Sequence, residues 1–158
     1  KRLIRIVYNV IAIALLTGLL LWLHIWVQKI TQPILSQLEL GLQYPSPDKY
    51  NFVFMSSVYL TAIVSVAVIV FLYYYCGHLL KIENKIIKSI VLAAIILEVK
   101  QDLIRQPLMN WLMHYQIGSP DALKIAFFRA LDVWSSNLAL AFLLVYFYKP
   151  KYSKTLVE

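Results

Sequence analysis

Residues 86–114 read IIKSIVLAAIILEVKQDLIRQPLMNWLMH, and they decide how often this chain crosses a membrane. The first twelve of them are mostly apolar and are typical of the start of a membrane helix. Four charged residues then follow within eight positions: Glu98, Lys100, Asp102 and Arg105. Charges persist at membrane depth only where they face a bundle interior, a water-filled cavity or a partner. We therefore expect a membrane helix whose charged side chains have partners.

The composition of the whole chain also indicates a membrane protein. Hydrophobic residues make up 61% of the 158 residues and charged residues 15%, against about 45–50% and about 25% in soluble domains. The net charge of +7 does not predict nucleic-acid binding, because membrane proteins gather Lys and Arg on their cytoplasmic loops. A single cysteine, Cys76, excludes an internal disulfide and a multi-cysteine metal site. We expect one transmembrane domain over residues 1–158.

Four apolar segments are expected to cross the bilayer, since a crossing needs about 20 apolar residues. Their ranges are about 4–27, 52–76, 86–115 and 123–148. The third would be about 45 Å long as a straight helix. It is expected to protrude from the membrane or to break at Gln106-Pro107, since proline removes a backbone donor. The predicted fold class is all-α, an integral membrane bundle of four transmembrane helices.

Basic residues predict the orientation of this bundle. Nine Lys and Arg residues lie in the N-terminus, the 77–88 loop and the C-terminal tail, and three lie in or beside the opposite loops. By the positive-inside rule, both termini are expected in the cytoplasm.

The first outer loop, residues 28–51, contains TQPILSQLELGL. Four of its apolar residues share one face at helical spacing: Ile34, Leu35, Leu38 and Leu42. We expect a short amphipathic helix there, lying on the outer membrane surface.

Six polar residues in the third and fourth segments form the candidate site. At 100° per residue, Glu98, Asp102 and Arg105 share one face of the third helix, while Lys100 points about 160° away. Arg129, Asp132 and Ser136 share one stripe of the fourth helix. Because the two helices run in opposite directions, both sets are expected in the outer half of the membrane.

Three interpretations of this charged cluster stay open. It can be an ion network that fixes which helices pack together, a pathway or binding site for an ion or small polar ligand, or a docking site for charges on another chain. His24 and His114 are weak candidates for a metal site, because two histidines without further ligands are a poor signal. No metal site is predicted, and the sequence leaves the question of a cofactor open.

The stretch ENKIIKSIVLAAIILEVKQDLIR, residues 83–105, carries a basic loop into an apolar and then charged third helix. In this layout the chain resembles the phosphate-starvation-inducible E family of small bacterial tetraspan membrane proteins. The resemblance implies a multi-pass protein of the bacterial inner membrane without a defined activity, and it carries over no catalytic residue. The QPLMNW stretch and the Arg129/Asp132 pair are not part of it.

The leading hypothesis for function is a non-catalytic subunit that docks on a larger membrane complex or assembles with copies of itself. The sequence has charges that need partners, but no nucleophile elbow, phosphate loop or zinc motif. One alternative is an ion or small-solute transporter or channel component, with Glu98 and Asp102 as a relay. A second alternative is an outer-leaflet enzyme acting on lipid headgroups, with Asp102 or Asp132 as general base. The expected partners are the lipid bilayer and other membrane chains, not nucleic acid.

Overall fold

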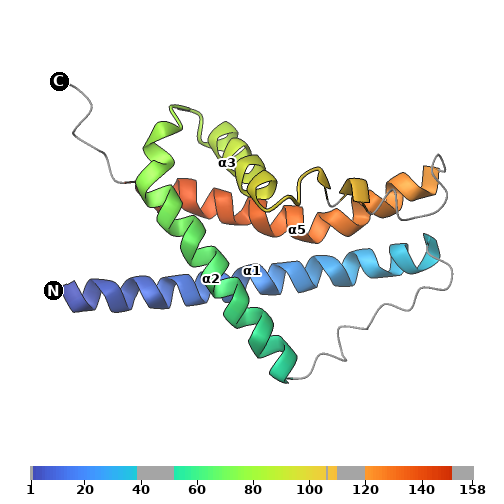
Figure 1. The fold of residues 1–158 in the computed structure, drawn as a ribbon, viewed down its shortest axis with the longest axis horizontal. Coiled ribbons are helices and arrows are strands. Elements are labelled where there is room, and N and C mark those ends of the chain that lie inside the picture. Colours follow the sequence, from blue (N-terminus) through green and yellow to red (C-terminus); the bar gives the residue numbers. More distant parts are fainter. Residues whose placement is uncertain (1, 39–51, 106, 110–119, 151–158) are drawn as a thin grey trace.

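The computed structural model describes residues 2–38, 52–105, 107–109 and 120–150 (Figure 1). Every regular element among these residues is a helix, and they contain no strand. The elements are α1 (Arg2–Leu38), α2 (Phe52–Cys76), the short 3-10 helix η2 (Gly77–Leu79), α3 (Lys85–Val99) and α5 (Pro120–Phe147). The predicted all-α class is confirmed.

Three helices are long and apolar enough to cross a membrane, over Val7–Leu38, Met55–Leu79 and Leu123–Phe147. They support the predicted multi-pass membrane class. The third predicted crossing is not among them, because α3 has 15 residues and is therefore about 22 Å long, less than the roughly 30 Å hydrocarbon core. Of the sixteen residues that follow α3 in that segment, 100–115, seven lie outside the described residues. The cytoplasmic placement of both termini stays a prediction.

The first helix is longer than expected. α1 continues through Pro33 to Leu38, so the residues assigned to a separate amphipathic surface helix extend α1 instead. Thr31 and Leu35 are buried within the protein, at 5% and 8% exposure. That packing explains why this segment is not laid out as a helix on the membrane surface. Leu42, the last residue of the expected apolar face, lies outside the described residues.

The third helix ends earlier than expected, at Val99 and not at Gln106-Pro107. Gln101 has a positive φ of 63°. Its backbone N–H donates to the Glu98 carbonyl at 2.9 Å, and the Asp102 N–H donates to the Leu97 carbonyl at 2.8 Å. This pair of bonds is the Schellman arrangement that satisfies the last carbonyls of a helix. The prediction of one straight or proline-broken helix over 86–115 is therefore wrong at this turn.

The start of α3 follows from its own sequence. Asn84 precedes the helix, and its side-chain Oδ1 accepts hydrogen bonds from the backbone N–H groups of Ile86 and Ile87, at 2.9 and 3.2 Å. Asparagine is among the best N-cap residues, because its oxygen satisfies donors that have no partner within the helix.

α1 and α5 form a long antiparallel pair, α3 packs against α5, and α2 crosses α1 obliquely (Figure 1). The hydroxyl of Tyr59 on α2 donates to the Ala14 carbonyl on α1 at 2.8 Å. Small residues in the core, Ala93 of α3 and Ala141 of α5, allow neighbouring helices to approach closely. The core cluster consists of Leu20, Val66, Val70, Tyr73, Leu92, Ala93, Ile96, Leu140, Ala141 and Leu144.

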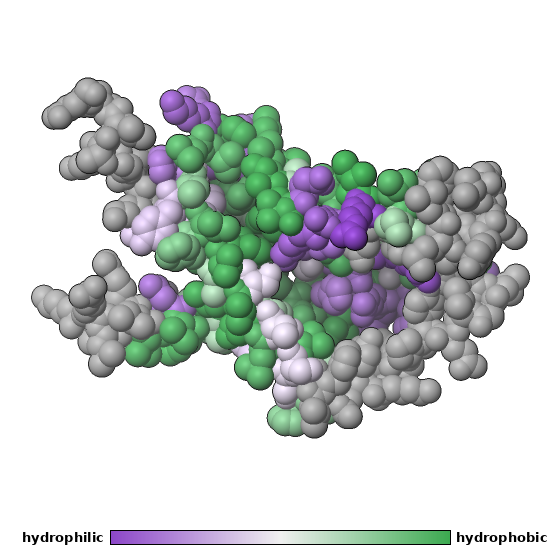
Figure 2. Space-filling model, viewed as in Figure 1, coloured by the Kyte–Doolittle hydropathy of each residue, from purple (hydrophilic) through white to green (hydrophobic). Residues whose placement is uncertain are grey.

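Much of the outer surface is hydrophobic, as the green areas in Figure 2 show. Large apolar side chains point outward from all three long helices; Leu15, Leu60 and Phe147 are 71%, 62% and 82% exposed. Monomeric soluble proteins rarely expose apolar surface on this scale. A bilayer accepts such a surface, which agrees with the three candidate spans.

Candidate functional site

The carboxylate of Asp132 is the centre of the candidate site. It lies on α5, only 8% exposed, and faces α1. The Gln28 side-chain Nε2 donates to Asp132 Oδ2 at 2.9 Å, and His24 Nε2 lies 3.6 Å from the same oxygen. His24 and Gln28 are four residues apart on α1 and are themselves 3.2 Å apart, Nε2 to Nε2. A buried carboxylate thus has two partners from one face of α1.

This trio is compatible with two hydrogen-bond arrangements. With His24 neutral, its Nε2 can accept one N–H of Gln28 while the other N–H is donated to Asp132. With His24 protonated, its Nε2–H points to Asp132 and forms an ion pair. The arrangement is therefore able to hold one proton between an imidazole and a carboxylate, a pairing common in proton relays.

A second contact joins the other side of α5 to the end of α3. The Lys100 ammonium donates to Asn137 Oδ1 at 3.0 Å, and Asn137 itself is only 6% exposed. The indole N–H of Trp134 donates to the Asp102 carbonyl oxygen at 3.1 Å. Both bonds hold the turn after Val99 against α5. Asn137 comes five positions after Asp132, so their side chains point about 140° apart around the helix.

Together these side chains form what we call the polar layer: His24, Gln28, Lys100, Asp102, Asp132 and Asn137. It lies where α1, α5 and the end of α3 meet. The Asp102 carboxylate is within electrostatic reach of both Lys100 and Asp132. The layer thus combines two acids, one lysine, one histidine and two amides.

Of the six site residues predicted from the sequence, Asp102 and Asp132 lie in the polar layer and the other four do not. Asp102 and Asp132 come close enough to interact electrostatically. Arg129 is partly buried one turn before Asp132 on α5. Ser136 donates to the Val133 carbonyl of its own helix at 3.0 Å, so it does not bridge to another helix.

Glu98 and Arg105 are both exposed and do not join the polar layer. Arg105 donates to the side-chain oxygen of Gln101, one turn before it. The helical face expected to hold Glu98, Asp102 and Arg105 together does not form, because α3 ends at Val99 and the backbone reverses its hand at Gln101. Helical spacing has no meaning across that turn.

The sequence pattern does not predict three members of the layer. Helical spacing places Lys100 away from the candidate cluster, and Gln28 and Asn137 are not among the candidate residues. One signal was available: His24 and Gln28 are a polar pair at i, i+4 in an apolar segment, which places them on one face. His24 is a partner of Asp132, while His114, the other weak metal candidate, lies outside the described residues. Within the described ranges, no three or more His, Cys, Asp or Glu residues are grouped to hold a metal ion.

Comparisons of the chain with protein-family models, with curated proteins and with solved structures gave no significant match. The resemblance to the phosphate-starvation-inducible E family stays a prediction.

Proposed function

We propose that this protein is a non-catalytic, multi-pass membrane subunit that assembles with other membrane chains. In this proposal the polar layer is a structural network that orders α1, α5 and the end of α3. Its central acid has its hydrogen-bond partner, Gln28, within the same chain, and so does Lys100 in Asn137. Because these members pair within one chain, the docking of other chains is left to charges outside the layer.

The observation that carries the proposal is the position of Glu98. Its carboxylate is exposed and makes no hydrogen bond or ion pair with any other described residue. It lies about 20 Å along α3 from Lys85, on the same face of the helix as the outward-facing Ile87, which is 51% exposed. A carboxylate on an apolar outward face is costly in lipid unless another chain supplies a cation or donor. Glu98 is therefore the proposed docking residue.

The test is the native mass of the particle extracted gently from its own membrane. We expect a mass well above that of one 18.3 kDa chain, and we expect Glu98→Gln to release the additional chains. Glu83→Gln is the matched control, because Glu83 is exposed in the connection before α3 and not on its outward face. A wild-type particle with a single chain, or equal loss in both variants, contradicts the proposal.

A second candidate is a carrier or channel component that moves protons or small cations. The contact between His24 and Asp132 favours it, because the pair can hold a proton next to a buried carboxylate. Here flux into liposomes containing the purified protein is the measurement. Asp132→Asn should abolish this flux and Glu98→Gln should leave it intact, whereas normal flux in Asp132→Asn removes this candidate.

A further inference from the structure

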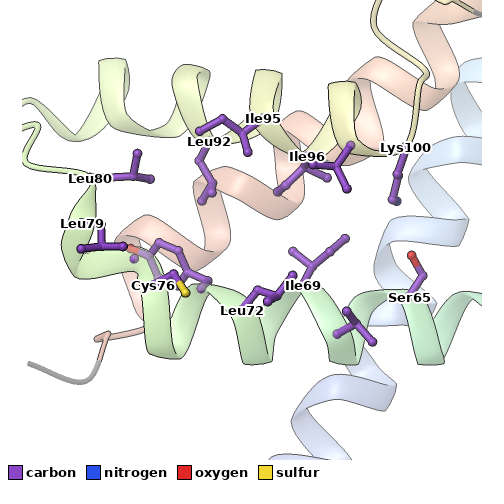
Figure 3. Close-up of a pocket in the computed structure, with 14 residues that line it drawn as sticks. Ser65, Ile69, Leu72, Cys76, Leu79, Leu80, Leu92, Ile95, Ile96 and Lys100 are labelled. Atoms are coloured by element: carbon purple, nitrogen blue, oxygen red, sulfur yellow. The ribbon is translucent and has the colours of Figure 1, made fainter. Parts of the chain in front are cut away.

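A groove runs between α2 and α3, which are joined by η2 and the short connection after it (Figure 3). Its volume is about 560 Å³, and nine of its fourteen lining residues are aliphatic. Leu92 and Ile96 of α3 face Ile69 and Leu72 of α2 across it (Figure 3). The volume falls within the roughly 300–1,000 Å³ of small-molecule sites.

The two ends of the groove differ in chemistry. At the η2 end, Leu79, Leu80 and Cys76 gather where the chain turns from α2 towards α3 (Figure 3). At the opposite end lie Lys100 and Ser65. The Lys100 ammonium has three N–H donors and donates one of them to Asn137. The groove is therefore apolar along its length, with a cation and a hydroxyl at one end.

The length of the groove and the charge at one end indicate its occupant. From Ser65 the groove follows α2 to its end at Cys76 and then η2 to Leu79, a length of about 22 Å. An apolar groove of this length with a cation at one end suits one extended hydrocarbon chain that carries an acidic head group.

We propose that this groove binds one long-chain fatty acid, with its carboxylate at Lys100 and its tail extending towards η2. A singly charged head suits the site, because the Asp102 carboxylate lies within electrostatic reach of Lys100 and repels a head of higher negative charge. The Ser65 hydroxyl lines the same end and is a further donor for the carboxylate. This inference stands independently of the proposed docking role of Glu98.

The first experiment measures saturable binding of radiolabelled palmitate to the protein in phosphatidylcholine nanodiscs, with empty nanodiscs subtracted. Ile95→Trp replaces an isoleucine that lines the groove with a larger, indole-bearing side chain. Ile90→Trp is the matched control: Ile90 is a similarly exposed isoleucine of α3, 52% against 45%, but it does not line the groove. We expect about one palmitate per wild-type chain, unchanged binding in Ile90→Trp, and binding at least tenfold weaker in Ile95→Trp, because the bulkier side chain fills space that the tail needs.

The second experiment locates the head group. Lys100→Gln should weaken palmitate binding roughly tenfold, as expected for loss of one charge-assisted hydrogen bond, and should leave binding of hexadecanol unchanged. The unfolding temperature of each variant is compared with that of the wild-type protein, to check that the fold around the groove is retained.

Three results overturn the proposal. They are no saturable palmitate above empty nanodiscs, equal binding by Ile95→Trp and Ile90→Trp, or equal weakening of palmitate and hexadecanol by Lys100→Gln. A native mass that falls in Ile95→Trp without any palmitate binding identifies another protein chain as the occupant, and it also rejects the fatty acid.

Discussion

The contact between Asp132 and Gln28 gives the most direct test of the polar layer. Asp132→Leu removes the buried acceptor and leaves the Gln28 N–H, now 2.9 Å from a carboxylate oxygen, without its partner. An unsatisfied buried donor costs about 1–3 kcal/mol, whereas hydrogen bonds between membrane helices are worth about 0.6 kcal/mol on average and about 1.7 at most. His24 at 3.6 Å is beyond normal hydrogen-bond length and adds little while neutral. We expect a loss of about 1–2 kcal/mol in the free energy of unfolding.

A double-mutant cycle measures this interaction without the other costs of each substitution. The variants are Asp132→Leu, Gln28→Leu and the pair together, unfolded reversibly by denaturing detergent in mixed micelles. If the two side chains interact directly, the double variant should be about 1 kcal/mol more stable than the sum of the single effects predicts. Asp132→Asn keeps an acceptor oxygen for Gln28 and should cost less than half as much as Asp132→Leu.

Ser136→Ala is the control for this cycle, because among the described residues the Ser136 hydroxyl bonds only to the carbonyl of Val133 on its own helix. We expect it to change stability by less than about 0.5 kcal/mol. Additive effects of Asp132→Leu and Gln28→Leu, or a cost of Ser136→Ala equal to that of Asp132→Leu, would refute the reasoning that the layer joins α1 to α5.

Three further predictions concern the backbone around α3. Gln101→Gly should stabilise the protein by about 0.5–1 kcal/mol. The left-handed backbone strains any residue that has a Cβ, and this strain is larger than the additional conformational entropy that glycine loses on folding. Gln101→Ala, measured by the same thermal unfolding, should give no gain in stability. Gly77→Ala should lower the unfolding temperature, because the added Cβ would lie 2.8 Å from the Tyr73 ring, whereas Gly18→Ala meets its nearest neighbour at 3.9 Å and should be tolerated; equal shifts would contradict this. Asn84→Ala should lower the free energy of unfolding by about 1 kcal/mol through loss of the N-cap, whereas Asn84→Asp should keep most of the stability that the cap provides. Thermal unfolding followed by circular dichroism measures both variants, and equal unfolding temperatures would count against the cap.

Lys100 belongs to both features described above. Its ammonium donates to Asn137 in the polar layer, and its side chain lines the end of the groove that lies opposite η2. A ligand carboxylate at Lys100 would therefore contact the same turn that Trp134 holds against α5. The groove and the helix packing at the end of α3 share one cation.

Much of the fold could be predicted from the sequence by itself. In lipid every backbone polar group needs an internal partner, so long apolar segments are restricted to helices. Composition and hydropathy therefore determined the all-α membrane class and the approximate positions of three long helices. The N-cap at Asn84 is also a local signal, because the bonds it makes reach only two and three residues along the chain.

Other features depended on contacts between distant residues. No glycine marks the end of α3 in the sequence, because Gln101 occupies the left-handed position. The turn is held instead by Trp134, which bonds to the carbonyl of Asp102, thirty-two residues away. Asp132 finds its donor 104 residues away, on α1. Helical periodicity determines which residues share a face of one helix, but it does not determine which helices meet. Only the tertiary structure decided that the predicted cluster separates, with Asp102 and Asp132 in the polar layer and Glu98 and Arg105 exposed.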